Sequence, residues 1–347
     1  MPNPTFGING FGRIGRTGFR VWWQFHRDQL DLKLINTSGS MEIEDWAHLL
    51  RYDSNYGPFT ETITVERTQS KKDVTPENPV LGILNIGGRS ILVTAQRDPK
   101  LIPWGTHGVE TVIESTGAFT SEEKAASHFE GGAQKVLISA PAKGGAISTS
   151  VIGVNTFDPA QKVRSNASCT TNCVAPVAQV MVKVFGVEKA MMTTAHAYTD
   201  DQNLHDNSQH DMRRARAAAK NIVPTTSGAA IATGEVIPEL KGIFDGFALR
   251  VPVAVGSISD MVFVTKRDTT IEEVNQALTQ AAADPAWQGI LAVTNEPLVS
   301  SDIVGRRESS IVDLALTNVV GGNLVKVVSW YDNEWGYCNR LIEQIGK

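Results

Sequence analysis

The first part of the chain alternates short apolar runs with longer mixed segments. An apolar run at Phe6–Asn9 precedes a glycine-rich turn, a segment expected to be helical to about His26, and a second apolar run at Leu32–Asn36. Strand, helix and strand in this order predict a β-α-β unit. Later apolar runs at Gly108–Ser115 and Lys135–Ala140 predict further parallel strands. The first half is therefore expected to form a doubly wound α/β sheet.

The second half has a different pattern, in which strands alternate with polar turns. A helix is predicted from Cys169 through Phe185, and a short amphipathic helix at about Glu334–Ile345 ends the chain. Between them, the predicted strands are 188–199, 246–267, 310–317 and 323–332. This arrangement indicates an α+β domain with a mostly antiparallel sheet backed by helices.

Two polar segments interrupt these elements. Gln69–Asn78 is predicted to be a surface loop between two short strands, without a catalytic role. Asp200–Val223 has no strand alternation over its first half and is expected to be a long ordered loop. Loops of this length are usually functional or lie at an interface.

Length and charge narrow the class of protein. The 347 residues exceed the ~250–300 at which single cores stop growing, so two domains are expected: 1–168 with the C-terminal helix 333–347, and 169–332. The net charge of −5 gives no basic footprint for nucleic acid. No run approaches the ~18 apolar residues of a membrane span, and Met1–Thr5 has no signal-peptide pattern, which predicts a cytoplasmic protein.

Three glycines after the first strand have the spacing G-x-G-x-x-G. Gly10 permits a tight turn, Gly12 lets the backbone approach a pyrophosphate, and Gly15 lets the helix pack on the strand. The unpaired N–H groups at the start of the helix then face the phosphates. Such glycines often serve only packing, but their place between a strand and a helix predicts a dinucleotide-binding turn.

The pattern with the clearest chemistry is Ser168-Cys169-Thr170-Thr171-Asn172-Cys173, together with His196 at the end of the next strand. A thiolate is a strong nucleophile, and we expect the helix start and the imidazole to lower the pKa of Cys169. His196 would accept a proton during the reaction. A zinc site is the competing interpretation, but Cys338 and the other histidines are scattered without metal-ligand spacing. Cys173 and Cys338 are expected to be packing residues.

Three longer motifs occur in order along the chain: Asn9-Gly10-Phe11-Gly12-Arg13-Ile14-Gly15-Arg16, Ser165-Asn166-Ala167-Ser168-Cys169-Thr170-Thr171-Asn172-Cys173 and Trp330-Tyr331-Asp332-Asn333-Glu334-Trp335-Gly336-Tyr337. With them the sequence closely resembles the phosphorylating glyceraldehyde-3-phosphate dehydrogenases over its length. The resemblance implies a Rossmann-type dinucleotide domain, a final helix that returns to it, and a homotetramer without a metal. It also implies a glycolytic reaction, the oxidation of D-glyceraldehyde 3-phosphate to 1,3-bisphosphoglycerate through a Cys169 thioester, with hydride passing to NAD or NADP.

The resemblance assigns further residues to two phosphates and to the cofactor. The substrate phosphate would contact Thr199, Asp201 and Arg250, and the attacking phosphate Ser168, Thr170, Arg216, Ser227 and Gly228. The cofactor would contact Gly10, Phe11, Gly12, Arg13, Ile14, Gly15, Asn36, Thr37, Arg97, Thr116, Gly117, Ser139, Ser208, Asn333 and Tyr337. Ser227 replaces the threonine usual in the family but keeps a hydroxyl. Arg213 and Arg214 are interpreted as solvated surface arginines.

Two departures from the family's NAD-specific pattern concern cofactor choice. An acid about 20 residues beyond the glycines normally binds the ribose 2′-hydroxyl and repels a 2′-phosphate. Here Thr37 follows Asn36, and the first acid is Glu42, expected to lie in the next helix. By resemblance, Asn207-Ser208 stands where NAD-specific members carry Leu-Pro and NADP-using members a small residue and serine. These two departures predict that NADP is accepted alongside NAD. Arg97 matches a residue near the adenosine in NAD-specific members as well, and it permits a contact with a 2′-phosphate.

Two other functions fit part of the pattern. An erythrose-4-phosphate dehydrogenase shares the cysteine and histidine but hydrolyses the thioester, whereas Thr170, Arg216 and Ser227-Gly228 favour transfer to phosphate. An inactive cofactor-binding interaction protein would not need an intact Cys169 and His196. The sequence therefore favours the phosphorylating enzyme, with a small-molecule substrate and inorganic phosphate as partners, and neither a membrane nor a nucleic acid.

Overall fold

The computed structural model describes residues 2–347, which divide into two compact units. The first unit holds the residues up to Thr149, with Phe157–Asn166 and Cys338–Lys347, and the second holds Ser150–Thr156 and Ala167–Tyr337. The segments 150–156, 167–168 and 333–337 therefore cluster with the second unit, although the sequence suggested the first. The bounds of the functional domains stay a prediction.

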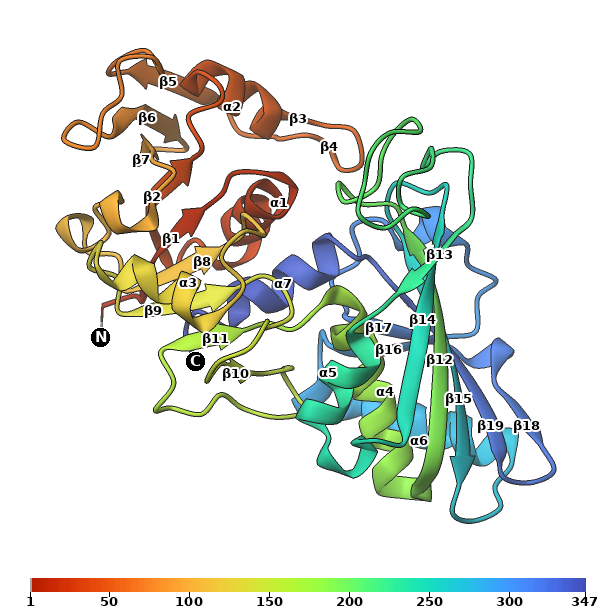
Figure 1. The fold of residues 1–347 in the computed structure, drawn as a ribbon. Coiled ribbons are helices and arrows are strands. Elements are labelled where there is room, and N and C mark those ends of the chain that lie inside the picture. The colour runs from red at the N-terminus through yellow and green to blue at the C-terminus, as the bar shows by residue number, and fades with distance from the viewer. Residues whose placement is uncertain (1) are drawn as a thin grey trace. The chain divides into compact units, whose positions relative to one another are not determined.

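The first unit is built on a doubly wound sheet with strand order β10-β11-β9-β8-β1-β2-β7-β6-β5 (Figure 1). Its strands are β1 (Thr5–Asn9), β2 (Asp31–Thr37), β5 (Ile63–Arg67), β6 (Val80–Ile86), β7 (Arg89–Ala95), β8 (Thr111–Glu114), β9 (Lys135–Ile138), β10 (Ser148–Thr149) and β11 (Val163–Ser165). A separate hairpin pairs β3 (Tyr52–Asp53) with β4 (Gly57–Pro58). Every pair in the large sheet is parallel except β5–β6 and β6–β7.

Helical segments complete this unit. They are α1 (Arg13–Val21), α2 (Ile43–Arg51), α3 (Glu122–Ala126), the end of α7 (Trp335–Glu343), and the single turns η2 (Pro99–Leu101), η3 (Gly105–His107) and η4 (Ser127–Phe129). The helix expected to reach His26 does so in two forms, because α1 ends at Val21 and a π-helical turn, η1 (Trp22–His26), continues it. Large aromatic rings pack there: Phe19 contacts Trp22 edge-on and lies parallel to Trp23.

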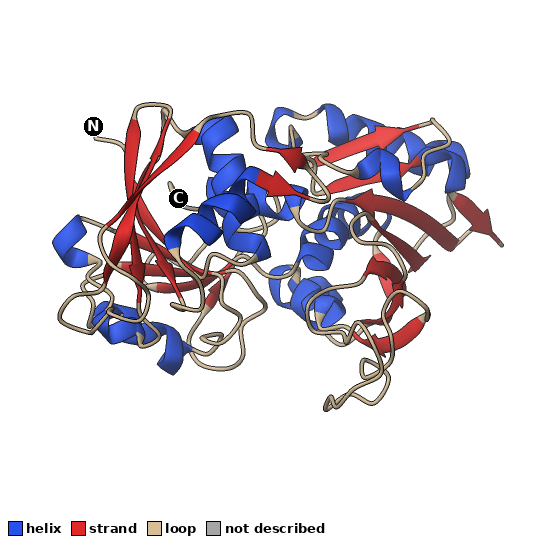
Figure 2. Cartoon of the chain, turned by 90° about the horizontal axis from the view of Figure 1, so that it is seen from above, coloured by secondary structure: helices blue, strands red, loops and turns tan. Residues whose placement is uncertain are grey.

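The second unit is an α+β arrangement around another large sheet (Figure 2). Its strands are β12 (Val187–Ala197), β13 (Val223–Thr226), β14 (Phe244–Val251), β15 (Ser257–Thr265), β16 (Leu291–Thr294), β17 (Ser310–Asp313), β18 (Asn318–Val320) and β19 (Leu324–Tyr331). Its helices are α4 (Cys169–Phe185), α5 (Ala229–Val236) and α6 (Ile271–Ala283), with single turns η5 (Pro238–Leu240), η6 (Pro285–Trp287), η7 (Ser300–Ile303) and η8 (Leu314–Leu316). The doubly wound sheet and this second sheet confirm the predicted fold class.

The structure corrects details of the second sheet. The run 246–267 is two strands, β14 and β15, because Pro252 lacks a ladder N–H and Gly256 adopts a positive φ of 93°. The run 310–317 ends as a strand at Asp313 and continues as a 3₁₀ turn. The pairs β12–β14 and β16–β17 are parallel, while the other pairs are antiparallel. The sheet is therefore mixed, with antiparallel pairs in the majority.

The core of the second unit lies on one face of this sheet, where α4, α5 and α6 pack (Figure 1). The opposite face carries the alternating residues of the same strands. Met191 and Phe247, which project from β12 and β14, are 63% and 42% exposed. No helix within residues 2–347 is long and apolar enough to cross a membrane.

Candidate functional site

Cys169 and His196 form a close pair in the second unit. Cys169 is the first residue of α4, and His196 is the penultimate residue of β12. The Cys169 Sγ lies 3.3 Å from the His196 Nε2. The His196 Nδ1 lies 2.7 Å from the carbonyl oxygen of Ala197, which can only accept a hydrogen bond, so Nδ1 carries the proton. The Nε2 lone pair therefore faces the sulfur and is placed to take its proton.

The backbone before Cys169 is held in an unusual conformation. Ala167 has a φ of 53°, the only positive φ of a non-glycine residue within residues 2–347. The left-handed region costs an alanine about 1–2 kcal/mol, so other contacts must hold it there. The Tyr337 hydroxyl donates a 3.1 Å hydrogen bond to the Ala167 carbonyl oxygen. Ser168 caps the helix by accepting a 3.0 Å hydrogen bond from the Thr171 N–H, which fixes Cys169 at the helix start.

Tyr331 supports both members of the pair, a role that the sequence analysis missed. Its hydroxyl lies 2.9 Å from the hydroxyls of Thr170 and Thr194, and its ring packs edge-on against the imidazole of His196. Thr170 follows the cysteine and Thr194 precedes the histidine by two residues. Tyr331 thus links the start of α4 to the end of β12. Its place in the Trp330–Tyr337 motif was the available signal.

Burial is the largest influence on the pKa values of both Cys169 and His196. It raises the pKa of the Cys169 thiol above its usual value, against the opposing effects of the Arg250 charge and of hydrogen bonds from Thr170. Burial and the Arg250 charge lower the pKa of His196 to about 4, against the Ala197 hydrogen bond. The expected lowering of the Cys169 pKa is therefore wrong for this structure, because desolvation outweighs the Arg250 charge and the hydrogen bonds to the sulfur. The resting pair is a thiol beside a neutral imidazole.

Arg250 lies next to His196 in the sheet and is aimed at a group of oxygen atoms. Its Nη1 donates a 2.5 Å hydrogen bond to the Thr199 hydroxyl and lies 3.7 Å from an Asp201 carboxylate oxygen. The Thr199 hydroxyl in turn donates to Asp201. The Arg250 Nε is buried without a partner in the described chain. A buried guanidinium N–H without a partner is costly, so this geometry favours an anionic ligand.

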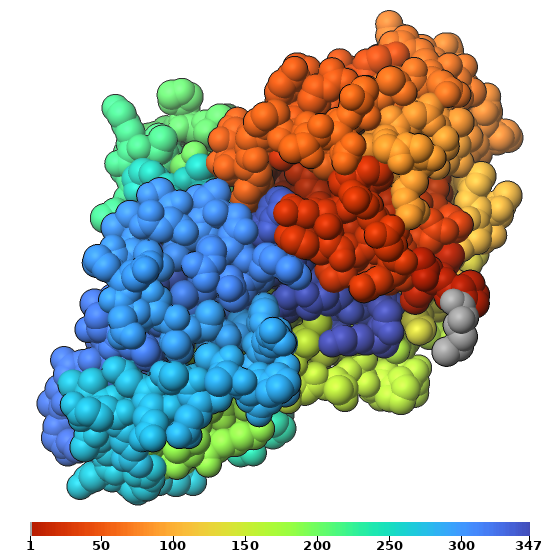
Figure 3. Space-filling model, turned by 180° about the vertical axis from the view of Figure 1, so that it is seen from behind, coloured from red at the N-terminus to blue at the C-terminus, as the bar shows by residue number. Residues whose placement is uncertain are grey.

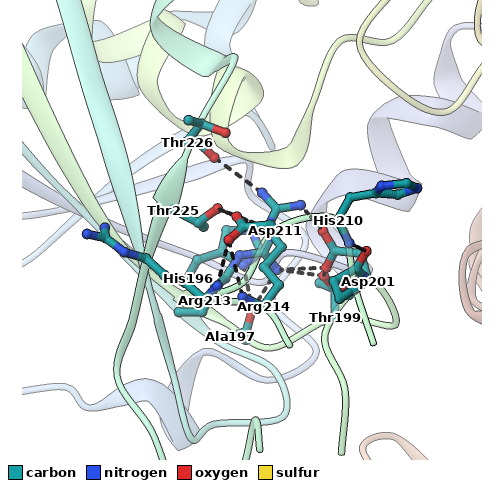
Figure 4. A network of polar contacts seen from close by, with 12 residues as sticks. His196, Ala197, Thr199, Asp201, His210, Asp211, Arg213, Arg214, Thr225 and Thr226 are labelled. Carbon is teal, nitrogen blue, oxygen red and sulfur yellow. Dashed lines mark hydrogen bonds and ion pairs between the residues drawn. The ribbon is translucent and has the colours of Figure 1, made fainter. Parts of the chain in front are cut away.

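Arg214, and not Arg216, joins this group (Figure 4). Arg214 bonds the other Asp201 carboxylate oxygen through Nη1, and its Nε donates a 2.9 Å hydrogen bond to the Thr225 hydroxyl. The Arg216 side chain is 61% exposed and pairs at 2.8 Å with Asp206. The interpretation of Arg214 as a solvated surface arginine is wrong, because Asp201, Asp211 and Thr225 surround it. Arg213 is exposed, as expected.

The remaining residues predicted for phosphate lie on two helix starts. Ser168 and Thr170 flank Cys169, and the Thr170 hydroxyl is buried against Tyr331. Ser227 and Gly228 precede α5, where the Ser227 hydroxyl accepts a 3.3 Å hydrogen bond from the Ala229 N–H. Backbone N–H groups at such starts suit an anion.

Cys173 is fully buried near Ser310 and Ser329, and burial raises its pKa to about 12.

In the first unit, the glycine turn has the shape that a dinucleotide needs. Gly10 has a φ of 92°, and a Cβ on Gly15 would lie 2.1 Å from the Gly10 carbonyl oxygen. A Cβ on Gly12 would meet open space, which is the room that a pyrophosphate would use. Phe11 is buried against Phe19. The start of α1 has no side-chain cap, so its first N–H groups suit an anion.

Arg13 and Ile14, the first residues of α1, would meet the cofactor through these N–H groups. The Arg13 side chain is directed elsewhere, since its Nη1 forms a 2.5 Å ion pair with Asp53.

A buried carboxylate connects the turn to the end of β8. Glu114 accepts hydrogen bonds from the Asn9 amide at 2.5 Å and from the Thr116 N–H at 2.8 Å, and it also contacts the Thr116 hydroxyl. His128 lies 3.0 Å from Glu114 and accepts from Trp104 through Nδ1, so its Nε2 carries the proton. Glu114 therefore sets the position of Thr116, while Gly117 is exposed beside it and Ser139 lies at the end of β9.

The residues at the end of β2 are turned inward. The Asn36 amide bonds Asn9, Thr94 and Gln96, and Thr37 is 1% exposed with its hydroxyl donating at 3.2 Å to the Thr94 carbonyl oxygen. Glu42 is not within the helix as expected; it is the residue that caps α2. The exposed groups at this strand end therefore belong to Ser38, Ser40 and Arg97.

Asn333 and Ser208, both predicted to contact the cofactor, lie in the second unit. The Asn333 side-chain oxygen accepts hydrogen bonds from the Gly256 N–H at 3.1 Å and the Ser257 hydroxyl at 3.0 Å, which leaves its NH₂ group for a ligand. Ser208 is exposed in the loop 200–223, where Asn203 bonds its carbonyl oxygen.

A glycine turn on a doubly wound sheet is typical of dinucleotide-dependent oxidoreductases, and a cysteine paired to a neutral histidine is typical of enzymes with a thiol nucleophile. Comparison with known proteins is more specific. Residues 5–122 match the family model described as "Glyceraldehyde 3-phosphate dehydrogenase, NAD binding domain", and residues 168–333 match "Glyceraldehyde 3-phosphate dehydrogenase, C-terminal domain".

Curated relatives match over nearly the whole chain. Glyceraldehyde-3-phosphate dehydrogenase 2 of Streptomyces arenae is 51% identical over 97% of this chain and 96% of its own length. The Geobacillus stearothermophilus glyceraldehyde-3-phosphate dehydrogenase is 48% identical with the same coverage, and that of Mycobacterium leprae is 45% identical over 98% and 97%. The chain therefore belongs to the glyceraldehyde-3-phosphate dehydrogenase family, which confirms the resemblance seen in its motifs.

Proposed function

We propose that this protein oxidises D-glyceraldehyde 3-phosphate to 1,3-bisphosphoglycerate with NAD or NADP and inorganic phosphate. The observation that carries the proposal is the 3.3 Å pair of the Cys169 sulfur and the unprotonated His196 Nε2. The names of the curated relatives support the substrate. As a step of glycolysis, the reaction is assigned to the cytoplasm, where the three free thiols stay reduced.

The chemistry follows from the order in which bonds form. An aldehyde does not lose hydride readily until a nucleophile adds to it. His196 takes the thiol proton as the sulfur of Cys169 attacks the carbonyl carbon, and it gives that proton to the carbonyl oxygen to form the thiohemiacetal hydroxyl. The neutral imidazole then takes the hydroxyl proton back as hydride leaves. A bound nicotinamide supplies the hydride acceptor. The product is a thioester, which phosphate attacks to give the acyl phosphate and the free thiol.

Two phosphates need cationic and hydroxyl partners. Arg250, Thr199 and Asp201 are assigned to the substrate phosphate, because they lie beside His196 and leave the Arg250 Nε without a partner. Ser168, Thr170, Ser227 and Gly228 stay with the attacking phosphate. Arg214 replaces Arg216 in this assignment, because Arg214 bonds Thr225 and Thr226, which directly precede Ser227, whereas Arg216 is exposed and pairs with Asp206.

Arg214→Ala is expected to raise the KM for inorganic phosphate by about tenfold or more, because a charge-assisted hydrogen bond contributes about 1.5–3 kcal/mol. Arg216→Ala is the matched control from the same loop and should leave this KM within about twofold, since exposed ion pairs contribute little. Steady-state kinetics with varied phosphate measures both. The assignment is overturned if Arg216→Ala has the larger effect.

NADP acceptance is the finer part of the proposal. β2 ends in a buried Thr37 instead of an acid, so no carboxylate at this position repels a 2′-phosphate. Arg97 is exposed two residues beyond β7, the strand that pairs with β2. Ser208, in place of the proline of NAD-specific members, is exposed in the loop 200–223. These features support use of both cofactors.

One experiment tests the reaction and the cofactor together. We expect reduction of NAD and of NADP to depend on inorganic phosphate, with kcat/KM values for the two cofactors within a hundredfold. Phosphate-independent turnover would indicate the hydrolytic erythrose-4-phosphate type instead, and no turnover would favour an inactive binding protein. Thr37→Asp is expected to reduce NADP use more than NAD use; an equal loss with both cofactors contradicts the role of Thr37.

The protein is also proposed to be a homotetramer. The sheet of the second unit leaves Met191 and Phe247 exposed, and Leu204 and Met212 of the loop 200–223 are 71% and 75% exposed. Exposed apolar patches of this kind are typical of interfaces between identical subunits. Light scattering in solution measures the mass directly; a monomer contradicts this part of the proposal.

A further inference from the structure

The loop Gln69–Asn78, which joins β5 to β6, is an ordered element and not a plain connection. The Gln69 amide donates to the carbonyl oxygens of Asn78 and Val80, at 2.8 and 2.7 Å. The Gln96 amide, just beyond β7, donates at 2.8 Å to the Thr75 carbonyl oxygen. These bonds close the loop on itself and attach it to the strand end that precedes Arg97. The segments around it form an outer face of the first unit, in orange (Figure 3).

The same loop reaches the turn that follows β2. The Lys71 ammonium donates a 2.6 Å hydrogen bond to the Ser40 carbonyl oxygen. Glu42 fixes this approach, since its carboxylate accepts from the Lys71 N–H at 3.0 Å and from the Ser70 hydroxyl at 2.9 Å. From the β7 side, the Arg97 Nε donates at 3.3 Å to the Ser38 carbonyl oxygen. Two cations from different elements therefore flank Ser38–Ser40.

The chemistry of this cluster suits a phosphate dianion. Lys71 uses one of its three donors and Arg97 one of its five. No ion pair within residues 2–347 engages either cation, although the Lys71 charge helps to lower the pKa of the nearby Glu42 carboxyl. The hydroxyls of Ser38 and Ser40 lie 3.0 Å apart and are exposed. Glu42 is the acid next to the cluster, and its oxygens are engaged by Ser70 and the Lys71 N–H. The cluster thus offers two cations and two hydroxyls.

The position of the cluster identifies the phosphate. In a doubly wound dinucleotide domain, the residues after the second strand meet the ribose of the adenosine. We propose that Lys71, carried by the loop Gln69–Asn78, is the main cation for the 2′-phosphate of NADP, with Arg97 on its other side. This inference rests on the proposed acceptance of NADP and assigns to the loop a binding role that the sequence did not indicate.

Calorimetric binding to the full-length protein tests the inference without turnover. The probes are 2′,5′-ADP and 5′-AMP, which differ only by the 2′-phosphate. Lys71→Met is expected to weaken 2′,5′-ADP binding about tenfold or more and to leave 5′-AMP binding within twofold. Lys71→Arg should restore most of the affinity. Lys72→Met, in the same loop, is the matched control and should change neither affinity by more than about twofold.

The outcomes separate this inference from the proposed function. If the unaltered protein does not bind 2′,5′-ADP more tightly than 5′-AMP, a favourable 2′-phosphate subsite is absent and the Lys71 assignment fails with it. If the unaltered protein prefers 2′,5′-ADP and Lys71→Met keeps that preference, NADP acceptance stands and only the assignment to Lys71 is overturned. An equal loss for both probes in Lys71→Met also overturns it, because the loop would then act on the adenosine as a whole.

Discussion

Replacing Cys169 with serine is expected to reduce kcat/KM for glyceraldehyde 3-phosphate by a factor of about 10⁴ or more. A serine hydroxyl beside His196 is a much weaker nucleophile than a thiol, and an oxygen ester would transfer its acyl group less readily than a thioester. Steady-state kinetics with both cofactors measures the loss. Folding should be preserved, because the Ser168 cap and the Tyr337 contact with Ala167 do not involve the sulfur.

Cys173 supplies the matched control for this variant. It lies one helical turn further along α4, where it is fully buried against Ser310 and Ser329, and its pKa of about 12 keeps it a thiol. Cys173→Ala should therefore retain activity within about threefold while losing about 1 kcal/mol of stability through a small cavity. Activity above about 1% in Cys169→Ser, or a comparable loss in Cys173→Ala, contradicts the assignment of the nucleophile.

Local patterns were sufficient to predict the pair at the centre of the site. Cys169 after a capping serine indicated a helix start, and His196 at the end of an apolar alternation indicated a strand end. Both inferences depend on residues within a few positions of each other. The glycine turn was predictable for the same reason, since Gly10 and Gly15 act on one another across a single turn.

Contacts between distant segments could not be predicted in this way. The choice between Arg214 and Arg216 depends on Asp201 and Thr225, which lie more than ten residues away on either side, and the loop conformation decides which arginine reaches them. Lys71 reaches Ser40 across a gap of 31 residues for the same reason. The pKa of Cys169 also escaped prediction, because desolvation depends on the whole surroundings of the sulfur and not on the helix start alone.

The strand order and direction in the second sheet also could not be predicted from local sequence patterns. Within the apolar run 246–267, only Pro252 and Gly256 indicate that the chain forms two strands. These two residues were too weak a signal to predict the break. The parallel pairing of β12 with β14 depends on where the chain goes between them, through the loop 200–223, β13 and α5. Period-two alternation predicts a strand but carries no information about its neighbour or direction.

His196→Asn is expected to lower kcat by about 10²–10⁴-fold, because proton transfer by a positioned base contributes a factor of this size. The KM for glyceraldehyde 3-phosphate should change by less than about threefold, since Arg250 and Thr199 bond one another without the imidazole. This split between kcat and KM distinguishes loss of the base from loss of the substrate site. A large rise in KM with an unchanged kcat contradicts the role of His196 as base.

The same variant reports on the burial of the imidazole through stability. Burial lowers the pKa of His196 to about 4, from 6.5 in an unfolded chain, so the unfolded state binds more protons between these two values. Above pH 6.5 the ring is neutral in both states, and the folded protein has its full stability. As the pH falls toward 4, the proton binds to the unfolded state and not to the buried ring, so the free energy of unfolding falls by up to about 3 kcal/mol. His196→Asn has no such proton to bind. As the pH is lowered from 7 to 5, the unaltered protein should therefore lose more of its unfolding temperature than this variant does. The exposed His205→Asn is the control, and an identical pH dependence of all three proteins would show that His196 is not held neutral by burial.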